Sequence, residues 1–487
     1  MSDGAVIEPG MVTNKSVLTE QQARGLLEQD SEAVVTLLVD MSRRIQALEE
    51  QLAKNSGNSS KPPSSDGLKK GPLQPMAPQS LRKKSGNRPG GQKGHTGSTL
   101  EAVETPNEIV VHTPDVCQHC YRNLNNDVVT SVSRRQVFEM PEPKVVVTEH
   151  HIVTRRCACC NKETRAAVPA GAEKPVQYGP NLLGYATYLH VVHLIPYARC
   201  AQILRETTGA PFSAGSLHQA IRTAHGRLAD FDQALQKALA DVDVVPVKYV
   251  DETGGRVAGK LHWFHVRCTE RLCRLFRHEK RGGEAVVADL QAYRGTLVSD
   301  FWSSYVSLPC KHVFCGAHVL RELTFVHEVQ GQGWARGLIS VLEKAVSACH
   351  RARARGSQKV WNANRLAARF RFWVKQGRLA NAPHLTTATS KVSKARCLAD
   401  RLWDRQEDYL RFLYDLSLPF TNNLSEQAIR MFKVKSKISG CFRTTEGADR
   451  FCRIRSYTAT CQRQGLSVLD CLRSIFTGEI TMPALRA

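Results

Sequence analysis

The chain has 487 residues, 42% of them hydrophobic, and a formal net charge of +22. A chain of this length is expected to hold about three or four domains, and that hydrophobic content supports real cores. So large an excess of Lys and Arg is typical of a protein that binds a polyanion such as DNA or RNA. No long apolar stretch appears, and residues 1–4 lack the basic and apolar regions of a signal peptide, which argues against a membrane-spanning or secreted protein. We therefore expect a cytoplasmic protein whose 16 cysteines are reduced or bind metal.

Residues 1–56 are predicted to form a helical region that contains a coiled-coil seam. The apolar residues of the seam are spaced alternately by four and by three positions. They are Val34, Leu38, Met41, Ile45, Leu48 and Leu52. This alternation is the heptad pattern of helices that associate with one another. The pattern covers fewer than three heptads, so a helix that packs on its own domain is the alternative. The seam predicts a homo-oligomer.

Residues 57–100 are rich in Ser, Pro, Gly, Lys and Arg. A segment of that composition cannot bury enough apolar surface to order itself. We predict a linker, and its basic side chains either follow a phosphate backbone or are simply solvated.

Two Cys-x-x-Cys pairs give the strongest metal signal in the chain, and they are Cys117 with Cys120 and Cys157 with Cys160. Four thiolates suit tetrahedral Zn²⁺ and leave no open position for a catalytic water. The pairs therefore predict a structural zinc ion, with reduced, metal-free thiols as the alternative.

The zinc-binding domain is expected to span residues 101–170. Residues 136–138 and 145–148, between the two pairs, can form the hairpin of a zinc ribbon, although the interval between the pairs is longer than usual. Cys159 and His119 are spare donors close to the four predicted ligands.

Residues 171–240 are predicted to be helical. One helix covers residues 198–208, residues 209–212 form a turn, and Ser213 caps a second helix. Two helices joined by a short turn are typical of a helix-turn-helix, so this region is a candidate DNA-binding region, with a simple packing unit as the alternative.

Residues 241–487 are predicted to form an α/β domain that begins with a buried strand over residues 244–250. Asp251 then lies at the carboxyl end of the strand, where α/β sheets tend to place active groups, and the Glu-Thr-Gly-Gly that follows it favours a turn. Because side chains alternate along a strand, Glu252 is expected to point to the opposite face from Asp251.

Two further acids invite pairing with Asp251. Asp300 ends a second short apolar run, and Glu426 lies near the start of a helix. Each acid also has an ordinary structural interpretation: Asp251 as a turn residue, Asp300 as the N-cap of a helix that begins at Phe301, and Glu426 as the third residue of an Asn-x-x-Glu capping box.

The order of the elements favours a functional interpretation of these acids. A hairpin over residues 260–276 follows the first strand, a helix is expected near Glu284 to Tyr293, and the Asp300 strand and a fifth strand over residues 311–315 come next. This order resembles the ribonuclease H fold, in which the first and fourth strands lie side by side. Asp251 and Asp300 would then share metal ions with Glu426, since carboxylates are hard oxygen ligands suited to Mg²⁺.

A helical insertion is predicted over about residues 331–418, between the fifth strand and Glu426. The chain then becomes strongly basic, and a charge run there would follow a substrate groove or form a solvated surface. The basic residues that we expect to bind DNA are Arg430, Lys433, Lys435, Lys437 and Arg443.

Several segments match one family by their order and spacing. They are NSSKPPSSD at residues 58–66, RPGGQKGH at 88–95, the two cysteine pairs, VDET at 250–253, SDFWSSY at 299–305, CGAH at 315–318 and NNLSE at 422–426. Together they resemble the DDE transposases of bacterial insertion sequences in the insertion sequence 66 group, over nearly the whole chain. Two positions depart from the family pattern, Thr421 and the pair Phe301-Trp302, and neither departure removes a metal ligand.

The resemblance implies a multidomain α/β protein with a ribonuclease H-like core and a helical insertion before the catalytic Glu. Asp251, Asp300 and Glu426 are then the catalytic acids, with Mg²⁺, or Mn²⁺ in its place, as the cofactor. His318 contacts DNA or the edge of the active site, with a packed strand end as the alternative for Cys315 and His318. The implied partners are the double-stranded DNA of the element ends and of the target, further copies of the chain, and companion proteins of the same element. The implied location is the bacterial cytoplasm, in association with the nucleoid.

The resemblance predicts an enzyme that cleaves DNA at the element ends and transfers the strands to a target. A zinc-containing DNA-binding repressor with a non-functional catalytic core is the alternative. The presence of all three acids favours the enzyme.

Overall fold

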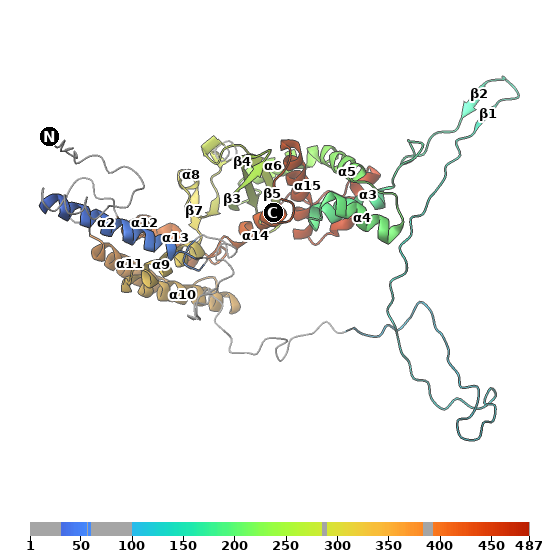
Figure 1. Ribbon diagram of the computed structural model, residues 1–487, viewed down its shortest axis with the longest axis horizontal. Helices are drawn as coiled ribbons and strands as arrows, with labels where there is room; N and C mark the ends of the chain where they lie inside the picture. The colour runs from blue at the N-terminus through green and yellow to red at the C-terminus, as the bar shows by residue number, and fades with distance from the viewer. Residues whose placement is uncertain (1–30, 56, 60–99, 285–289, 383–392, 487) are drawn as a thin grey trace, which may run out of the picture. The chain divides into compact units, whose positions relative to one another are not determined.

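The structure is a computed structural model (Figure 1), and it describes residues 31–55, 57–59, 100–284, 290–382 and 393–486. The predicted linker over residues 57–100 lies almost wholly outside the described residues, and so do residues 285–289 of the helix predicted from Glu284 to Tyr293. No helix in the described part of the chain combines the length and the apolar character needed to cross a bilayer.

The chain divides into two compact units. The first unit combines residues 1–80 with residues 313–421, and the second combines residues 81–312 with residues 422–487. Each unit is therefore built from two separate stretches of the chain.

A five-stranded sheet has the strand order β5-β4-β3-β6-β7. Its strands are β3 (Val247–Val257), β4 (Lys260–Cys268), β5 (Cys273–His278), β6 (Thr296–Ser299) and β7 (Lys311–Phe314). β3 and β5 each run antiparallel to β4, while β6 runs parallel to β3. The predicted arrangement, with the fourth strand beside the first, is confirmed.

The predicted end of the first strand at Asp251 is wrong, because β3 continues to Val257. The turn lies instead at Ala258 and Gly259, which have left-handed φ angles of 48° and 78°. Gly255 is a packing position and not a turn, since a Cβ atom there would collide with the ring of Phe432. Continuous pairing with β4 keeps this part of β3 extended.

One face of the sheet is covered by α14 (Asn423–Ser439), which packs on β3 and β4. The rings of Phe432 and Phe264 stack there with centroids 3.7 Å apart. The other face carries an apolar cluster that includes Val250, Leu297 and Tyr305, and Tyr305 lies in the short helix α8 (Ser303–Val306).

The edge strand β5 is covered by α15 (Thr445–Arg463). The backbone N–H of Leu275 donates a hydrogen bond of 2.8 Å to Ser456 Oγ, and that of Cys273 donates one of 3.1 Å to Thr460 Oγ1. These hydroxyl groups satisfy donors that an open sheet edge would expose.

The predicted helical region of the second unit is confirmed. Its elements are α3 (Pro180–Thr187), the π-helix η2 (Tyr188–Val192), α4 (Tyr197–Thr208), α5 (Ala214–Arg227) and α6 (Ala229–Ala240). Ser213 caps α5 as expected, because its Oγ accepts a hydrogen bond of 3.0 Å from the N–H of Ser216. Of these, α3, η2, α5 and α6 pack against α15 or α16 (Val468–Thr477) of the same unit, and α4 packs on its neighbours α3, η2 and α5.

The helical insertion is also confirmed for the described residues of the first unit. It comprises α10 (Gly333–Ala354), α11 (Ala363–Ala380), α12 (Lys394–Asp404) and α13 (Gln406–Tyr414), after α9 (Gly316–Glu328). The aromatic and aliphatic side chains that hold these helices together are buried along one face of each helix.

The N-terminal helix α2 (Ser31–Leu52) belongs to the same unit and contacts it near its C-terminal end. Glu50 accepts a hydrogen bond of 3.1 Å from Gln330. The predicted seam is open to solvent along the helix, where Leu38 is 61% exposed and Leu48 is 58% exposed. The alternative in which the seam packs on its own domain is therefore wrong.

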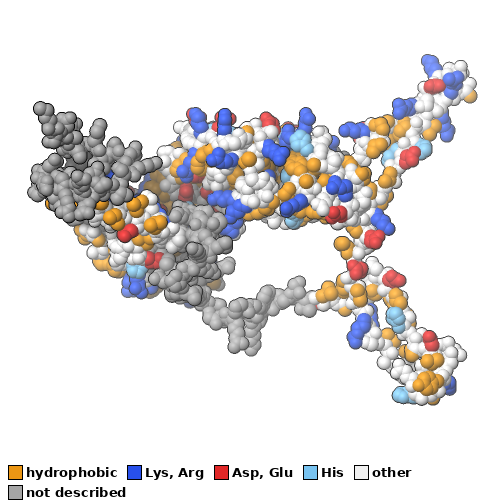
Figure 2. All heavy atoms as spheres, viewed as in Figure 1, with side chains coloured by type: hydrophobic (Ala, Val, Ile, Leu, Met, Phe, Trp, Pro, Cys, Tyr) orange, Lys and Arg blue, Asp and Glu red, His pale blue; other side chains and the backbone are white. Residues whose placement is uncertain are grey.

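The predicted zinc-ribbon hairpin is not formed as expected, because residues 136–138 and 145–148 are not strands. The hairpin is instead β1 (Thr154–Arg156) with β2 (Glu163–Arg165), which flanks the second cysteine pair. Figure 2 shows apolar side chains in the open along this part of the chain, and Val146 is 87% exposed. Strands need an apolar layer to pack on, and this segment has none.

Candidate active site

Two aspartates lie in matching positions on the parallel strands β3 and β6. The last matched pair of these strands is Tyr249 with Val298. Asp251 and Asp300 each come two residues after that pair, and adjacent strands lie about 4.8 Å apart. The sheet therefore places the two acids side by side, where β6 ends.

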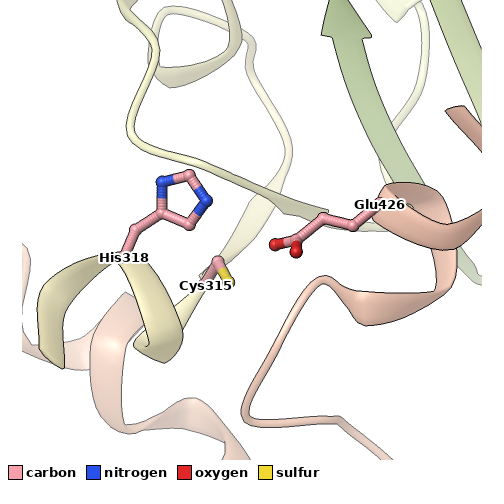
Figure 3. Close-up of side chains that lie close together, drawn as sticks. All are labelled: Cys315, His318 and Glu426. Carbon is pink, nitrogen blue, oxygen red and sulfur yellow. The ribbon is translucent and has the colours of Figure 1, made fainter. Parts of the chain in front are cut away.

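Glu426 lies in the first turn of α14 (Figure 3). The start of this helix is tied to β3, because Asn422 Nδ2 donates a hydrogen bond of 2.7 Å to the carbonyl oxygen of Val250. Ser425 Oγ donates to Asn422 Oδ1 at 2.5 Å and holds that amide in place. Since Val250 directly precedes Asp251, these contacts hold the start of α14 beside the strand of Asp251. The carboxylate oxygens of Asp251, Asp300 and Glu426, all three of which are described residues, do not all lie within 4.8 Å of one another.

The ordinary interpretations of the three acids are wrong. Asp251 lies inside a strand and not in a turn. The helix after Asp300 begins at Ser303, with Trp302 as its N-cap. The N-cap of α14 is Asn422, so Asn423 is already the first residue of the helix and does not begin a capping box with Glu426. The side chain of Asn422 makes no cap hydrogen bond and is bound to β3 instead.

The electrostatics of this cluster suit a cation. Burial, followed by the nearby carboxylates of Glu252, Asp300 and Glu426, raises the pKa of Asp251 to about 8. Several acids in a poorly solvated place repel one another, and a divalent cation with oxygen ligands relieves that repulsion. The donor set of Asp251, Asp300 and Glu426 therefore fits Mg²⁺ or Mn²⁺.

Glu252 faces away from Asp251, as alternation along the strand predicted. Its carboxylate accepts a hydrogen bond of 2.8 Å from the hydroxyl of Tyr305, which lies in the apolar cluster on the opposite face from α14. It also forms an ion pair of 2.8 Å with Arg281. The sequence did not predict these two partners of Glu252. No local pattern indicates that Arg281 binds Glu252, because the two residues are 29 positions apart in the chain.

Four of the five basic residues predicted to bind DNA are exposed: Arg430, Lys433, Lys437 and Arg443. The first three follow Glu426 by 4, 7 and 11 residues, so at 3.6 residues per turn they share its side of α14.

The prediction for Lys435 is wrong. Its side chain is buried, with Nζ 4.3 Å from the centre of the Phe442 ring, and burial lowers its pKa. Lys435 follows Glu426 by nine residues, which places it on the opposite side of α14, toward the sheet. It is therefore not placed to contact a phosphate.

Cys315 and His318 lie at the start of α9, in the first unit (Figure 3). Cys315 is the N-cap residue and is buried, and His318 lies in the first turn and is half-buried. The predicted contact of His318 with DNA stays a prediction.

Each cysteine pair forms the same tight turn. The N–H of Cys117 donates to the carbonyl oxygen of Arg122, and that of Cys157 donates to Lys162, both at 2.8 Å. Backbone N–H groups, first those of His119 and Cys160 respectively, lower the pKa of Cys117 and of Cys157. Each turn therefore favours the thiolate form that binds metal.

The structure does not gather the four cysteines into one site. Among the described residues, which include all four, no three of these thiolates lie within 4.8 Å of one another. A single ion bound by all four is a proposal that requires the two turns to approach.

Three family models match the chain. The transposase IS66 family matches residues 175–450, the zinc-finger binding domain of transposase IS66 matches residues 114–161, and a family of unknown function matches residues 19–101. No curated protein matches the chain. The first model includes Asp251, Asp300 and Glu426, and the second includes all four predicted zinc ligands. Because the first match covers more than half of the chain, the protein belongs to the IS66 family of transposases.

Proposed function

We propose that the protein is a DDE transposase that binds the ends of an insertion sequence, cleaves the DNA there and joins the freed strands to a target. One observation carries the proposal: the parallel pairing of β3 with β6 puts Asp251 and Asp300 in matching positions, beside the start of α14. The strand order and the acid on the following helix support a ribonuclease H-like core for this chemistry.

Asp251, Asp300 and Glu426 would hold the divalent cations. Bound Mg²⁺ or Mn²⁺ would supply activation of the attacking oxygen and neutralisation of charge on the leaving oxygen. The protein contributes position, since hydrogen bonds at Val250 link the helix of Glu426 to the strand of Asp251, and parallel pairing links that strand to the one before Asp300. Burial of Asp251 keeps its carboxylate poorly hydrated and therefore receptive to a cation.

The exposed basic residues of α14 would hold the DNA backbone. Arg430, Lys433 and Lys437 continue from Glu426 along one side of the helix, so a phosphate backbone that follows them arrives at the acids. The pair α4 and α5 is proposed as a second DNA contact, in the manner of a helix-turn-helix.

Zinc and self-association complete the proposal. Cys117, Cys120, Cys157 and Cys160 would bind one structural Zn²⁺ in the segment matched by the zinc-finger model. The exposed seam of α2 would bind a second copy of the chain.

A strand-transfer assay tests the catalytic proposal. Purified protein, DNA carrying the element ends and Mg²⁺ should give cleaved ends and joined products. Asp251→Asn, Asp300→Asn and Glu426→Gln should each remove both products while DNA binding persists, since an amide lacks the charged oxygen that binds the cation. A double substitution should cost little more than a single one, because the acids act as a unit. Strand transfer by the Asp300→Asn protein at the unaltered rate would contradict the proposal.

A further inference from the structure

Glu252, the residue next to Asp251, is a buried carboxylate with two fixed partners. Its side chain is 2% exposed. The hydroxyl of Tyr305 donates to Oε2 at 2.8 Å, and Nη2 and Nε of Arg281 donate to Oε1 at 2.8 and 3.2 Å. Both carboxylate oxygens are therefore engaged on the face of β3 opposite to Asp251.

Two tryptophans hold Arg281 in place. The guanidinium carbon lies 4.8 Å from the ring centroid of Trp263 and 4.8 Å from that of Trp302. Trp263 comes from β4, opposite Gly254 of β3, and Trp302 comes from the chain just after Asp300. A guanidinium held by two rings and by two hydrogen bonds to one carboxylate oxygen has little freedom to move.

Tyr305, which binds Glu252, and Trp302, which contacts Arg281, come from the segment that carries the other aspartate. Trp302 and Tyr305 follow Asp300 by two and five residues, and Tyr305 is anchored in the apolar cluster with Val250 and Leu297. The chain around Asp251 and the chain around Asp300 are thus linked on the far face of the sheet, at the level of the two acids.

We propose that Glu252 is a positioning residue: with Tyr305 and Arg281 it fixes the separation of Asp251 and Asp300 and thereby the affinity of the site for divalent cations. The inference rests on the proposed function, because it assumes that these two acids bind the ions. Burying a charged group costs free energy even when it is paired, so a hydrophobic pair would hold the fold at least as well. A buried carboxylate beside the acids is explained by the geometry that it imposes. Groups that orient metal ligands in this way commonly change metal affinity by about 10-fold to 100-fold.

The test compares Glu252→Gln and Tyr305→Phe with the unaltered protein over a range of Mg²⁺ concentrations. Each substitution removes one component of the link with little change in size. The concentration of Mg²⁺ for half-maximal cleavage should rise by about tenfold or more, and saturating Mg²⁺ should restore most of the rate. Binding of element-end DNA in EDTA should be unchanged.

Tyr293→Phe is the matched control. Tyr293 is buried in the same apolar cluster, and its hydroxyl donates a hydrogen bond of 2.9 Å to the carbonyl oxygen of Val245, two residues before β3 begins. This variant loses a buried hydrogen bond of the same kind and should keep the half-maximal Mg²⁺ concentration of the unaltered protein. If Glu252→Gln fails to fold, Tyr305→Phe and its control carry the test.

The outcomes separate this inference from the proposed function. Full cleavage by Asp251→Asn would overturn the proposed function itself. If Asp251→Asn is inactive and Tyr305→Phe has the Mg²⁺ requirement of Tyr293→Phe, the acids are catalytic and the positioning role is wrong. A folded Glu252→Gln protein that is inactive at every Mg²⁺ concentration would overturn the inference in another way, by making Glu252 a ligand.

Discussion

Asn422 donates a hydrogen bond of 2.7 Å to the carbonyl oxygen of Val250, and this bond joins the helix of Glu426 to the strand of Asp251. Both groups are buried, and the two residues are 172 positions apart in the chain. A helix acid and a strand acid can act together only if such a contact fixes their separation.

Replacement of Asn422 by Ala should therefore damage both stability and chemistry. It leaves the carbonyl oxygen of Val250 without this donor, at a cost of about 1–3 kcal/mol. Thermal unfolding should show the loss of stability, and cleavage at saturating Mg²⁺ should fall further than the unfolded fraction explains. Asn423→Ala, at the exposed neighbouring position, is the control and should behave like the unaltered protein.

The raised pKa of Asp251 predicts a pH dependence of stability in the absence of divalent ions. The folded protein holds this proton up to about pH 8, whereas an unfolded Asp releases it near pH 3.8. The folded state thus binds more protons across that window, so stability falls as the pH rises through it, by roughly 1.4 kcal/mol per pH unit at most.

Asp251→Asn removes this dependence. In EDTA the variant should unfold at the same temperature as the unaltered protein near pH 4 and at a higher temperature at pH 8. At pH 8, Mg²⁺ should reduce the difference in unfolding temperature between the variant and the unaltered protein, because it binds the ionised carboxylate of Asp251. Equal unfolding temperatures at pH 8 without metal would show that Asp251 is not held in a strained, buried state.

The exposed basic stripe on α14, formed by Arg430, Lys433 and Lys437, predicts how DNA affinity depends on salt. Replacing Arg430, Lys433 and Lys437 by Gln should weaken binding to element-end and unrelated DNA alike. The slope of log affinity against log salt should become shallower by about 2 to 3, for three lost phosphate contacts. Fluorescence anisotropy at several salt concentrations measures this slope.

Lys435→Met is the matched control for the stripe, because Lys435 is buried against Phe442 and Phe451. Its salt slope should stay that of the unaltered protein. A triple Gln variant that loses affinity for the element ends alone would show that these side chains read bases and not phosphates.

The cysteine turns predict one zinc ion per chain. Metal analysis of the reduced protein should find about one Zn²⁺, and Cys117→Ser or Cys157→Ser should remove it. Cys159→Ser should retain it, because Cys159 lies between the paired cysteines of its turn. Chelation should also increase protease cleavage within residues 101–170, where the chain has little core of its own. A folded, reduced sample without zinc would contradict the assignment.

The α2 seam predicts a parallel, in-register pairing of two chains. With Leu38 and Ile45 at a positions, Arg44 falls at g and Glu49 at e. In a parallel dimer the g residue of one helix faces the following e residue of the other, so Arg44 meets Glu49 of the second copy with opposite charge.

Sedimentation analysis checks this pairing. Ile45→Asp should shift the protein toward the monomer, and Arg44→Glu should weaken association by a smaller amount. Adding Glu49→Arg to Arg44→Glu should restore association, since the charges are then exchanged. A mass that is unchanged by Ile45→Asp would exclude the seam as the interface.

The sequence alone determined the features that depend on local periodicity and on order along the chain. The alternation of side chains placed Asp251 and Glu252 on opposite faces of β3, and the heptad spacing identified the α2 seam. The order of strands and helices resembles that of the ribonuclease H fold, and this resemblance predicted that β6 lies beside β3. Each of these follows from residues that are close together or from a simple succession of elements.

Only the tertiary structure decided the features that depend on a distant partner. Gly255 reads as a turn residue until Phe432 is seen to occupy the space of a side chain, and Lys435 reads as a phosphate contact until the sheet is seen to cover its side of α14. The link from Arg281 to Glu252 has no local signal, because its energy comes from ring contacts and an ion pair between separate segments. The type of a residue does not by itself decide whether its side chain is solvated or buried. Which groups pack against it depends on how the whole chain folds.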